Sequence, residues 1–175
     1  MLQAMNELDE VWEQMLAEAA KNPQLHEGLA EFIAVKTAND ALREISVKWL
    51  FETMQDVAAH ANRKNAGISI EKSDSHRFSS ANSSYVGSLL KFRQGVRCLT
   101  VEAGWTRSPG DGFMRGNALA VARLTHFGIA KANAELHLIK FEDRPRWFTV
   151  GEDRLRISFE LKDLLNHFQI FLGTA

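Results

Sequence analysis

Apolar residues recur at helical spacing through the first third of the chain. Between residues 5 and 19 they repeat every three or four positions, which predicts an amphipathic helix ending at Asn22-Pro23. A short helix is expected over 25–35. A longer run of helical spacing, from 42 to 61, follows Thr37-Ala38-Asn39-Asp40, which is typical of a helix start because the Thr side chain can cap free backbone amides. We expect this long helix to lie across a sheet.

The middle of the chain changes to alternating or continuous apolar runs. Gln94-Gly95 separates two of them and predicts a tight hairpin, because glycine accepts the positive φ of such turns. The segment 86–128 therefore predicts a three-stranded antiparallel meander, with a glycine-rich connection at 106–116. The polar segment 72–84 predicts either a loop or a loosely paired edge strand around 76–78. Further short strands are expected at 68–71, 135–141, 147–150 and 154–157.

Apolar residues at helical spacing from Leu161 to Leu172 predict a closing helix, with Ser158 as its cap and Gly173 past its end. Helices, then consecutive strands, then a helix predict an α+β fold in one domain. The preferred arrangement is a curved sheet wrapped around the long helix. A sheet of this kind can enclose a pocket between its concave face and the helix. The expected layers are a helical layer over 1–65, an antiparallel meander of about five to six strands over 66–157 and a C-terminal amphipathic helix over 158–173.

Composition and charge narrow the class of protein only a little. The 175 residues are 45% hydrophobic and 25% charged, which is enough for a core without a metal or disulfide. The net charge of −1 divides into −5 over 1–65 and +4 over 66–175. This asymmetry suits an anion-binding surface, but a solvated sheet beside acidic helices gives the same pattern. The overall charge is too low to favour nucleic acid as the main partner.

The single cysteine, Cys98, excludes an intramolecular disulfide and fits a reducing compartment. No uncharged apolar run has the length of a membrane-spanning helix, and the acidic N-terminus lacks the pattern of a signal peptide. We therefore expect a cytoplasmic protein with no membrane among its partners.

Strong catalytic signatures are missing from the sequence. It has no glycine loop followed by Lys-Ser or Lys-Thr, and no GxGxxG, HExxH or GxSxG. We predict no cofactor. The carboxylates and imidazoles of the type that binds metals are Glu102, Asp111, His126, Glu135 and His137. A histidine in a strand more often satisfies local hydrogen bonds, so we predict no metal site.

The loop 107–116 is the best candidate for a site. Glycines flank Asp111, and Arg107 and Arg115 could face each other across the loop to hold a carboxylate or phosphate. The alternative is an ordinary connection in which arginine pairs with aspartate. Phe113 and Met114 either tuck under the sheet or contact a partner.

Three functions compete on these residues. The first is a non-enzymatic binding or adaptor module, working as a homodimer, that holds a protein partner or a small anionic or apolar ligand. The second is an enzyme acting on an anionic substrate. Its site would combine Arg107, Asp111, Arg115, His126 and Glu102. The third is a nucleic-acid-binding face of arginines and aromatic rings, formed by Arg93, Arg97, Arg107, Arg123 and Lys140 with neighbouring aromatic residues.

Overall fold

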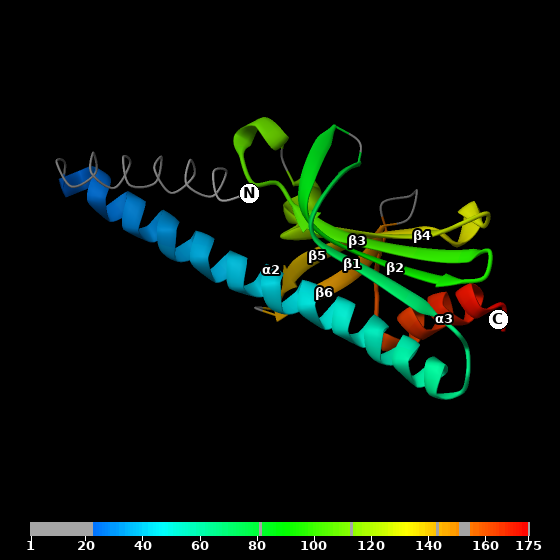
Figure 1. The fold of residues 1–175 in the computed structure, drawn as a ribbon. Helices are drawn as coiled ribbons and strands as arrows, with labels where there is room; N and C mark the ends of the chain where they lie inside the picture. Colours follow the sequence, from blue (N-terminus) through cyan, green and yellow to red (C-terminus); the bar gives the residue numbers. More distant parts are fainter. Residues whose placement is uncertain (1–22, 81, 113, 143, 151–154, 175) are drawn as a thin grey trace. The chain divides into compact units, whose positions relative to one another are not determined.

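The computed structural model describes residues 23–80, 82–112, 114–142, 144–150 and 155–174 (Figure 1). Contacts divide the chain into two compact units, Met1–Ala41 and Leu42–Ala175. The fold is α+β, with a long helix, an antiparallel sheet and a C-terminal helix. The helix predicted over 5–19 lies outside the described residues.

Helix α2, Pro23–Arg63, is one continuous helix of 41 residues. The sequence predicted two helices here, with a new start at Thr37, and that division was wrong. No glycine or proline occurs between 29 and 63, and Lys36 Nζ bonds Asp40 Oδ2 at 2.7 Å across the predicted start. A capping residue caps only where the preceding backbone is not helical. In the first unit, the described residues are 23–41, all of which belong to α2. Phe32 in this part of the helix is exposed.

The sheet has seven strands in simple sequence order, and every neighbouring pair is antiparallel. The strands are β1 Ser69–Ser80, β2 Ser83–Gln94, β3 Arg97–Trp105, β4 Ala120–His126, β5 Ala134–Phe141, β6 Arg144–Val150 and β7 Arg156–Ser158. This is one or two more than predicted. Most of the polar segment 72–84 belongs to β1, and its last two residues begin β2. The interpretation of this segment as an edge strand is therefore confirmed, and the strand is longer than expected.

The predicted hairpin joins β2 to β3, but its loop lies one residue later than expected. Gln94 is paired with Arg97, so the two loop residues are Gly95 and Val96, and Gly95 has a φ of 59°. The predicted glycine-rich connection joins β3 to β4 and contains two short 3₁₀ turns, η1 (Pro109–Asp111) and η2 (Arg115–Asn117). A third, η3 (Ala130–Ala132), precedes β5.

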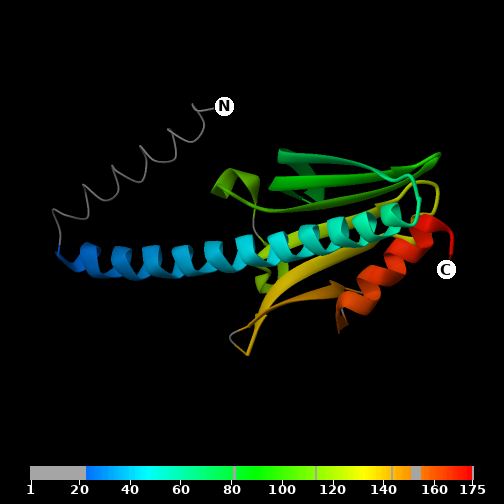
Figure 2. The same ribbon diagram turned by 60° about the horizontal axis from the view of Figure 1, so that its bottom comes forward.

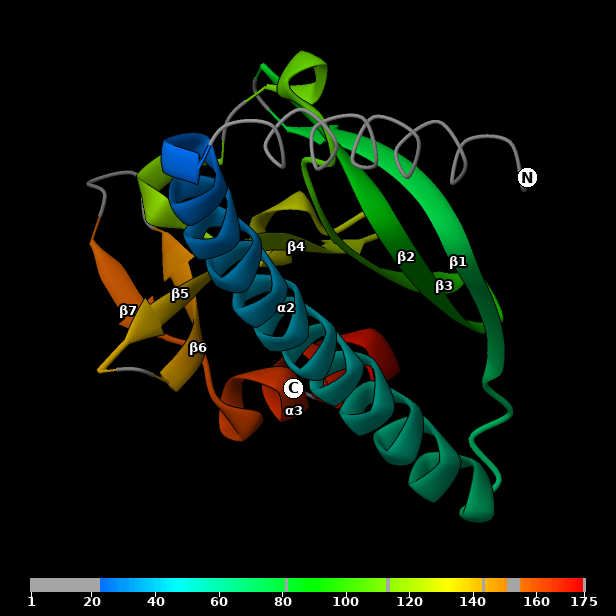
Figure 3. The ribbon, with the colours of Figure 1, turned by 90° about the vertical axis from the view of Figure 1, so that its left-hand side faces the viewer.

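The core lies between one face of the sheet, the second half of α2 and helix α3, Leu161–Leu172. Figure 3 shows the strands curving around α2, and Figure 2 shows α3 beside its C-terminal end. The largest fully buried side chains include Leu50 and Met54 of α2, Phe92 of β2 and Leu164 of α3. Neither of these α-helices has an apolar stretch long enough to cross a membrane in the part of the chain described.

Helix α3 starts with a capping box and not with the predicted Ser158 cap. The Glu160 side chain accepts from the backbone of Asp163, and the Asp163 side chain accepts from the backbone of Glu160. Gly173 ends the helix in the left-handed conformation, as predicted.

Candidate functional site

The most promising opening is a cleft of about 410 Å³ between α2 and the inner face of β1, β2 and β3, which we call the α2 cleft. Its walls are α2 on one side and β1 on the other, and its floor is formed by β2, β3 and the Phe51 side chain of α2. The cleft lies within the unit Leu42–Ala175, in the place where a curved sheet can enclose a pocket against the long helix.

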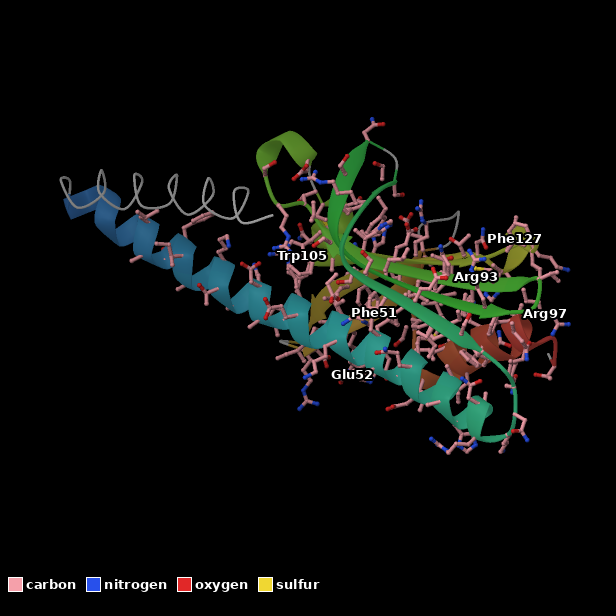
Figure 4. The ribbon with its side chains drawn as sticks, viewed as in Figure 1. Phe51, Glu52, Arg93, Arg97, Trp105 and Phe127 are labelled. Carbon is pink, nitrogen blue, oxygen red and sulfur yellow. The ribbon has the colours of Figure 1, made fainter. Side chains whose placement is uncertain are left out.

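Two aromatic rings and two small residues form the floor. Trp105 of β3 is 8% exposed and Phe51 of α2 is 4% exposed, so each shows the cleft only a small part of its ring (Figure 4). Ser88 and Ala103 are cross-strand partners that also line the cleft. Their short side chains leave room that leucine or phenylalanine would fill, which explains why a packed sheet face is open here.

Charged side chains of both signs surround this floor. Lys48 Nζ lies 3.8 Å from Glu52 Oε1 on α2, and Lys72 Nζ lies 3.0 Å from Asp74 Oδ1 on β1. Arg107 lies over the Trp105 ring, with its Cζ 4.2 Å from the ring centroid. Three cations from three segments of the chain therefore reach the rim of one aromatic-floored cleft, together with the carboxylates of Glu44, Glu52 and Asp74.

The loop 107–116 supplies Arg107 to the cleft, but the Asp111 side chain of this loop accepts hydrogen bonds from within the loop. Asp111 Oδ2 accepts hydrogen bonds from the backbone amides of Arg107 (3.2 Å) and Ser108 (3.0 Å) and from Ser108 Oγ (3.0 Å). Burial acts to raise the pKa of the Asp111 carboxyl, but these hydrogen bonds and nearby Arg77 lower it below its usual value. The carboxylate thus closes a tight turn. Met114 packs against the core.

Two of the other predicted site residues, Glu102 and His126, lie away from Arg107. Arg115 belongs to η2, and its side chain, like Phe113, lies outside the described residues. Glu102 lies on the outer face of the sheet, and His126 lies on the inner face beneath α3. The structure therefore separates Glu102 and His126 from Arg107 and Asp111. Glu102 points to the outer face because adjacent residues of β3 face opposite sides, and His126 is paired with Leu99, at the end of β3 far from Trp105.

Glu102 belongs to a charged network on the outer face. Its Oε2 accepts from Arg123 Nη2 (2.6 Å) and Nε (2.8 Å), and its Oε1 lies 2.7 Å from His76 Nε2. Beside it, Glu135 Oε1 lies 2.9 Å from His137 Nε2. This hydrogen bond is the main reason why the pKa of Glu135 lies below its usual value. No group of three or more potential ligands for a metal ion occurs among the described residues.

The end of the β1–β2 hairpin covers this network. Ser80 Oγ of β1 donates to Glu135 Oε2 of β5 at 2.7 Å, although four strand-to-strand steps separate the two in the sheet. Phe78 and Tyr85 of the hairpin pack on Val121 of β4. The hairpin therefore folds back over the outer face and buries the carboxylate of Glu102, whose side chain is 11% exposed. These contacts suit a structural role for Glu102.

His126 pairs with His167 of α3. Its Nε2 lies 3.0 Å from Nδ1 of His167, so one ring donates and the other accepts. Burial, and then the neighbouring His167, lower the pKa of His126 to about 4. Burial also lowers the pKa of His167, although Asp163 opposes this effect. Two neutral imidazoles therefore join the sheet to α3.

A second opening, the Trp49 groove, has a volume of about 620 Å³ and runs between α2 and the segment from β6 to the start of α3. Trp147 lies at its base, where its Nε1 donates to the Ser46 carbonyl at 3.4 Å. Its rim carries Ile45 of α2, which is 64% exposed, Trp49 and Leu161. Neighbouring Ile157 of β7 is equally exposed.

Sequence reasoning found Arg107 but missed the residues that surround it. Trp105 lies two positions earlier in the chain, so the alternation of β3 could have placed it on the inner face with Ala103. Phe51 and Lys48 come from a helix more than fifty residues away. Only the packing of α2 against this part of the sheet brings them to the cleft.

The fold and cleft define an α+β protein in which an antiparallel sheet surrounds a helix and leaves a ligand-sized opening beside it. No protein-family model matches the chain, and no curated protein or solved structure is significantly similar to it.

Proposed function

We propose that this protein is a non-enzymatic binding module that holds a small amphipathic anion in the α2 cleft. The flat apolar part of the ligand would contact Trp105 and Phe51. Its carboxylate or phosphate would be reached by Lys48, Lys72 or Arg107. The observation that carries the proposal is the convergence of these three cations on an aromatic floor in an opening of about 410 Å³, a size usual for small-molecule sites.

The acidic and imidazole groups that the sequence offered for catalysis lie outside the cleft. The carboxylates that line it are Glu44, Glu52 and Asp74, and the last two form ion pairs with Lys48 and Lys72, an arrangement that favours binding over catalysis. The Asp111 carboxylate is held by hydrogen bonds within its own loop, that of Glu102 by Arg123 and His76 of other strands, and His126 is buried against His167. None of the three lines the α2 cleft. A general base must be within hydrogen-bond reach of the reacting group, and these residues are turned to other partners.

Titration with 2-naphthoate tests this function, with neutral 2-naphthalenemethanol as the matched probe. We expect the carboxylate to bind more tightly, and to shift the NMR signal of the Trp105 indole N–H. Ser88→Phe should fill the floor and abolish binding of both probes. Arg107→Gln should weaken the binding of 2-naphthoate and leave the binding of the neutral probe unchanged. Arg77→Gln is the control, because this exposed arginine lies outside the cleft.

Binding of 2-naphthoate that survives Ser88→Phe would place the ligand elsewhere. Failure of both probes to bind, with the fold intact, would contradict the proposal.

A second candidate function is self-association through the Trp49 groove. Large apolar side chains from α2, β7 and α3 remain exposed around it, and such patches mark interfaces more often than plain surface. Native mass spectrometry of the full chain would show a homodimer, and Ile45→Ser with Trp49→Ser should return it to a monomer. A monomer in the unmodified protein would contradict this function.

A further inference from the structure

The two most exposed large apolar side chains of the described residues lie on neighbouring turns at one end of the sheet. Val96, in the β2–β3 turn, is 88% exposed, and Phe127, just after β4, is 75% exposed. Ile129 lies in the same connection as Phe127 and is partly exposed. We call Val96, Phe127 and Ile129, with the cations Arg93 and Lys131, the turn-end patch.

Backbone contacts fix the two turns side by side. Leu99 is paired with His126, and the amide of Phe127 donates to the carbonyl of Cys98 at 2.9 Å. Gly128 follows Phe127 with a φ of 78°, as Gly95 precedes Val96, so each apolar residue adjoins a sharp reversal of the chain. Figure 4 shows Phe127 at the same end of the sheet as Arg93 and Arg97.

The same turns are uniformly basic. Segments 91–98 and 127–133 contain four cations and no acidic residue. Glu71 of β1 lies 3.7 Å from Lys91 and 3.8 Å from Arg93. Arg97 donates to the Leu172 carbonyl at the end of α3. The Glu71 carboxylate therefore contributes one negative charge at this end of the sheet, which is smaller than the positive charge of the four cations on the turns.

We propose that the turn-end patch binds the surface of an anionic lipid bilayer. Protruding apolar side chains need no matching cavity in a bilayer, because they enter the boundary between headgroups and acyl chains. Cations beside them contact the anionic headgroups, and each strengthens binding about fivefold. Contact of this kind requires no membrane-spanning helix, and it revises the expectation of no membrane partner.

Flotation of the full chain with lipid vesicles tests the proposal. The protein should float with vesicles of phosphatidylcholine and phosphatidylserine, and much less with phosphatidylcholine alone. High salt should release it, because the attraction of exposed charges is screened. Val96→Ser with Phe127→Ser should weaken binding by about tenfold or more, since the apolar contact is lost. Arg93→Gln with Lys131→Gln should also weaken it.

Val35→Ser is the matched control, because Val35 of α2 is an exposed apolar residue, at 54%, outside both the patch and the Trp49 groove. Its vesicle binding should equal that of the unmodified protein, and circular dichroism should show that every variant is folded. Three outcomes would overturn the proposal. They are absence of binding to phosphatidylserine vesicles, binding unchanged by the Val96 and Phe127 substitutions, and complete displacement by duplex DNA at matched ionic strength.

Discussion

Gly87 of β2 and Gly104 of β3 are cross-strand partners, and neither has room for a side chain. A Cβ on Gly87 would lie 1.9 Å from the Ala103 carbonyl oxygen, and one on Gly104 would lie 2.7 Å from that of Val86. The two backbones therefore approach closely where the β1–β2 hairpin turns over the outer face of the sheet. A register shift in β1 between Ser73 and His76 lies beside this point.

Gly87→Ala should destabilise the protein by about 3 kcal/mol or more, because backbone atoms would have to separate to admit the new methyl group. Urea unfolding monitored by circular dichroism measures the loss. Gly110→Ala is the control, since its nearest neighbour would be Ser108 Oγ at 3.7 Å, an ordinary contact. Equal free energies of unfolding for Gly87→Ala and Gly110→Ala would mean that β2 and β3 can move apart at little cost to admit the methyl group.

Glu102→Gln should lower the free energy of unfolding by about 1–3 kcal/mol, because it leaves Arg123 and His76 without a charged acceptor in a covered site. Glu52→Gln, in the exposed ion pair with Lys48, should cost about 0–0.5 kcal/mol. A double-mutant cycle with Arg123→Gln measures the coupling. A coupling near zero would mean that the network contributes no stability.

Stability should fall as the pH drops from about 6.5 to about 4. The pKa of His126 is near 6.5 in the unfolded chain and about 4 in the folded one, so between these values the unfolded chain binds more protons. The resulting loss is about 3 kcal/mol at the acid end of this window. Above pH 7 the effect is absent. Thermal melts from pH 4 to 8 should show a smaller loss for His126→Gln, and an identical pH profile for the two proteins would exclude His126 as its source.

Asp111→Ala should loosen the loop at a cost of about 1 kcal/mol, because three hydrogen bonds to one carboxylate oxygen are lost. Hydrogen exchange of the Ser108 amide should increase. Asp56→Ala, an exposed change on α2, should have no comparable effect. If Asp111→Ala left this exchange unchanged but abolished binding of an anionic ligand, the role predicted from sequence would replace the structural one.

Local chemistry accounts for what the sequence predicted well. The hairpin near Gln94-Gly95, the existence of β4 and β5, and the end of α3 at Gly173 follow from turn residues and apolar patterns within a few positions. The length of β1 could not be predicted in this way, because its polar residues are held in a strand by pairing with β2 and by the outer-face network.

The candidate site was harder to predict for a related reason. Sequence proximity gathered Arg107, Asp111 and Arg115, whereas the α2 cleft depends on which part of α2 crosses β3. The small size of Ser88 and Ala103 was visible in the sequence, but its consequence depends on the large residues opposite them. Packing between distant segments carries this information.

The two edges of the sheet limit how copies of this chain can associate. At β1, the charges of Lys72 and Asp74 and the nearby bulge interrupt the ladder that an incoming strand would need, and at the other edge β7 has only three residues. Assembly by continuous sheet extension, the route to fibres, is therefore obstructed at both sides. A dimer formed by the described part of the chain would then use side-chain surfaces, so mild detergent should dissociate it more readily than a hydrogen-bonded strand pair.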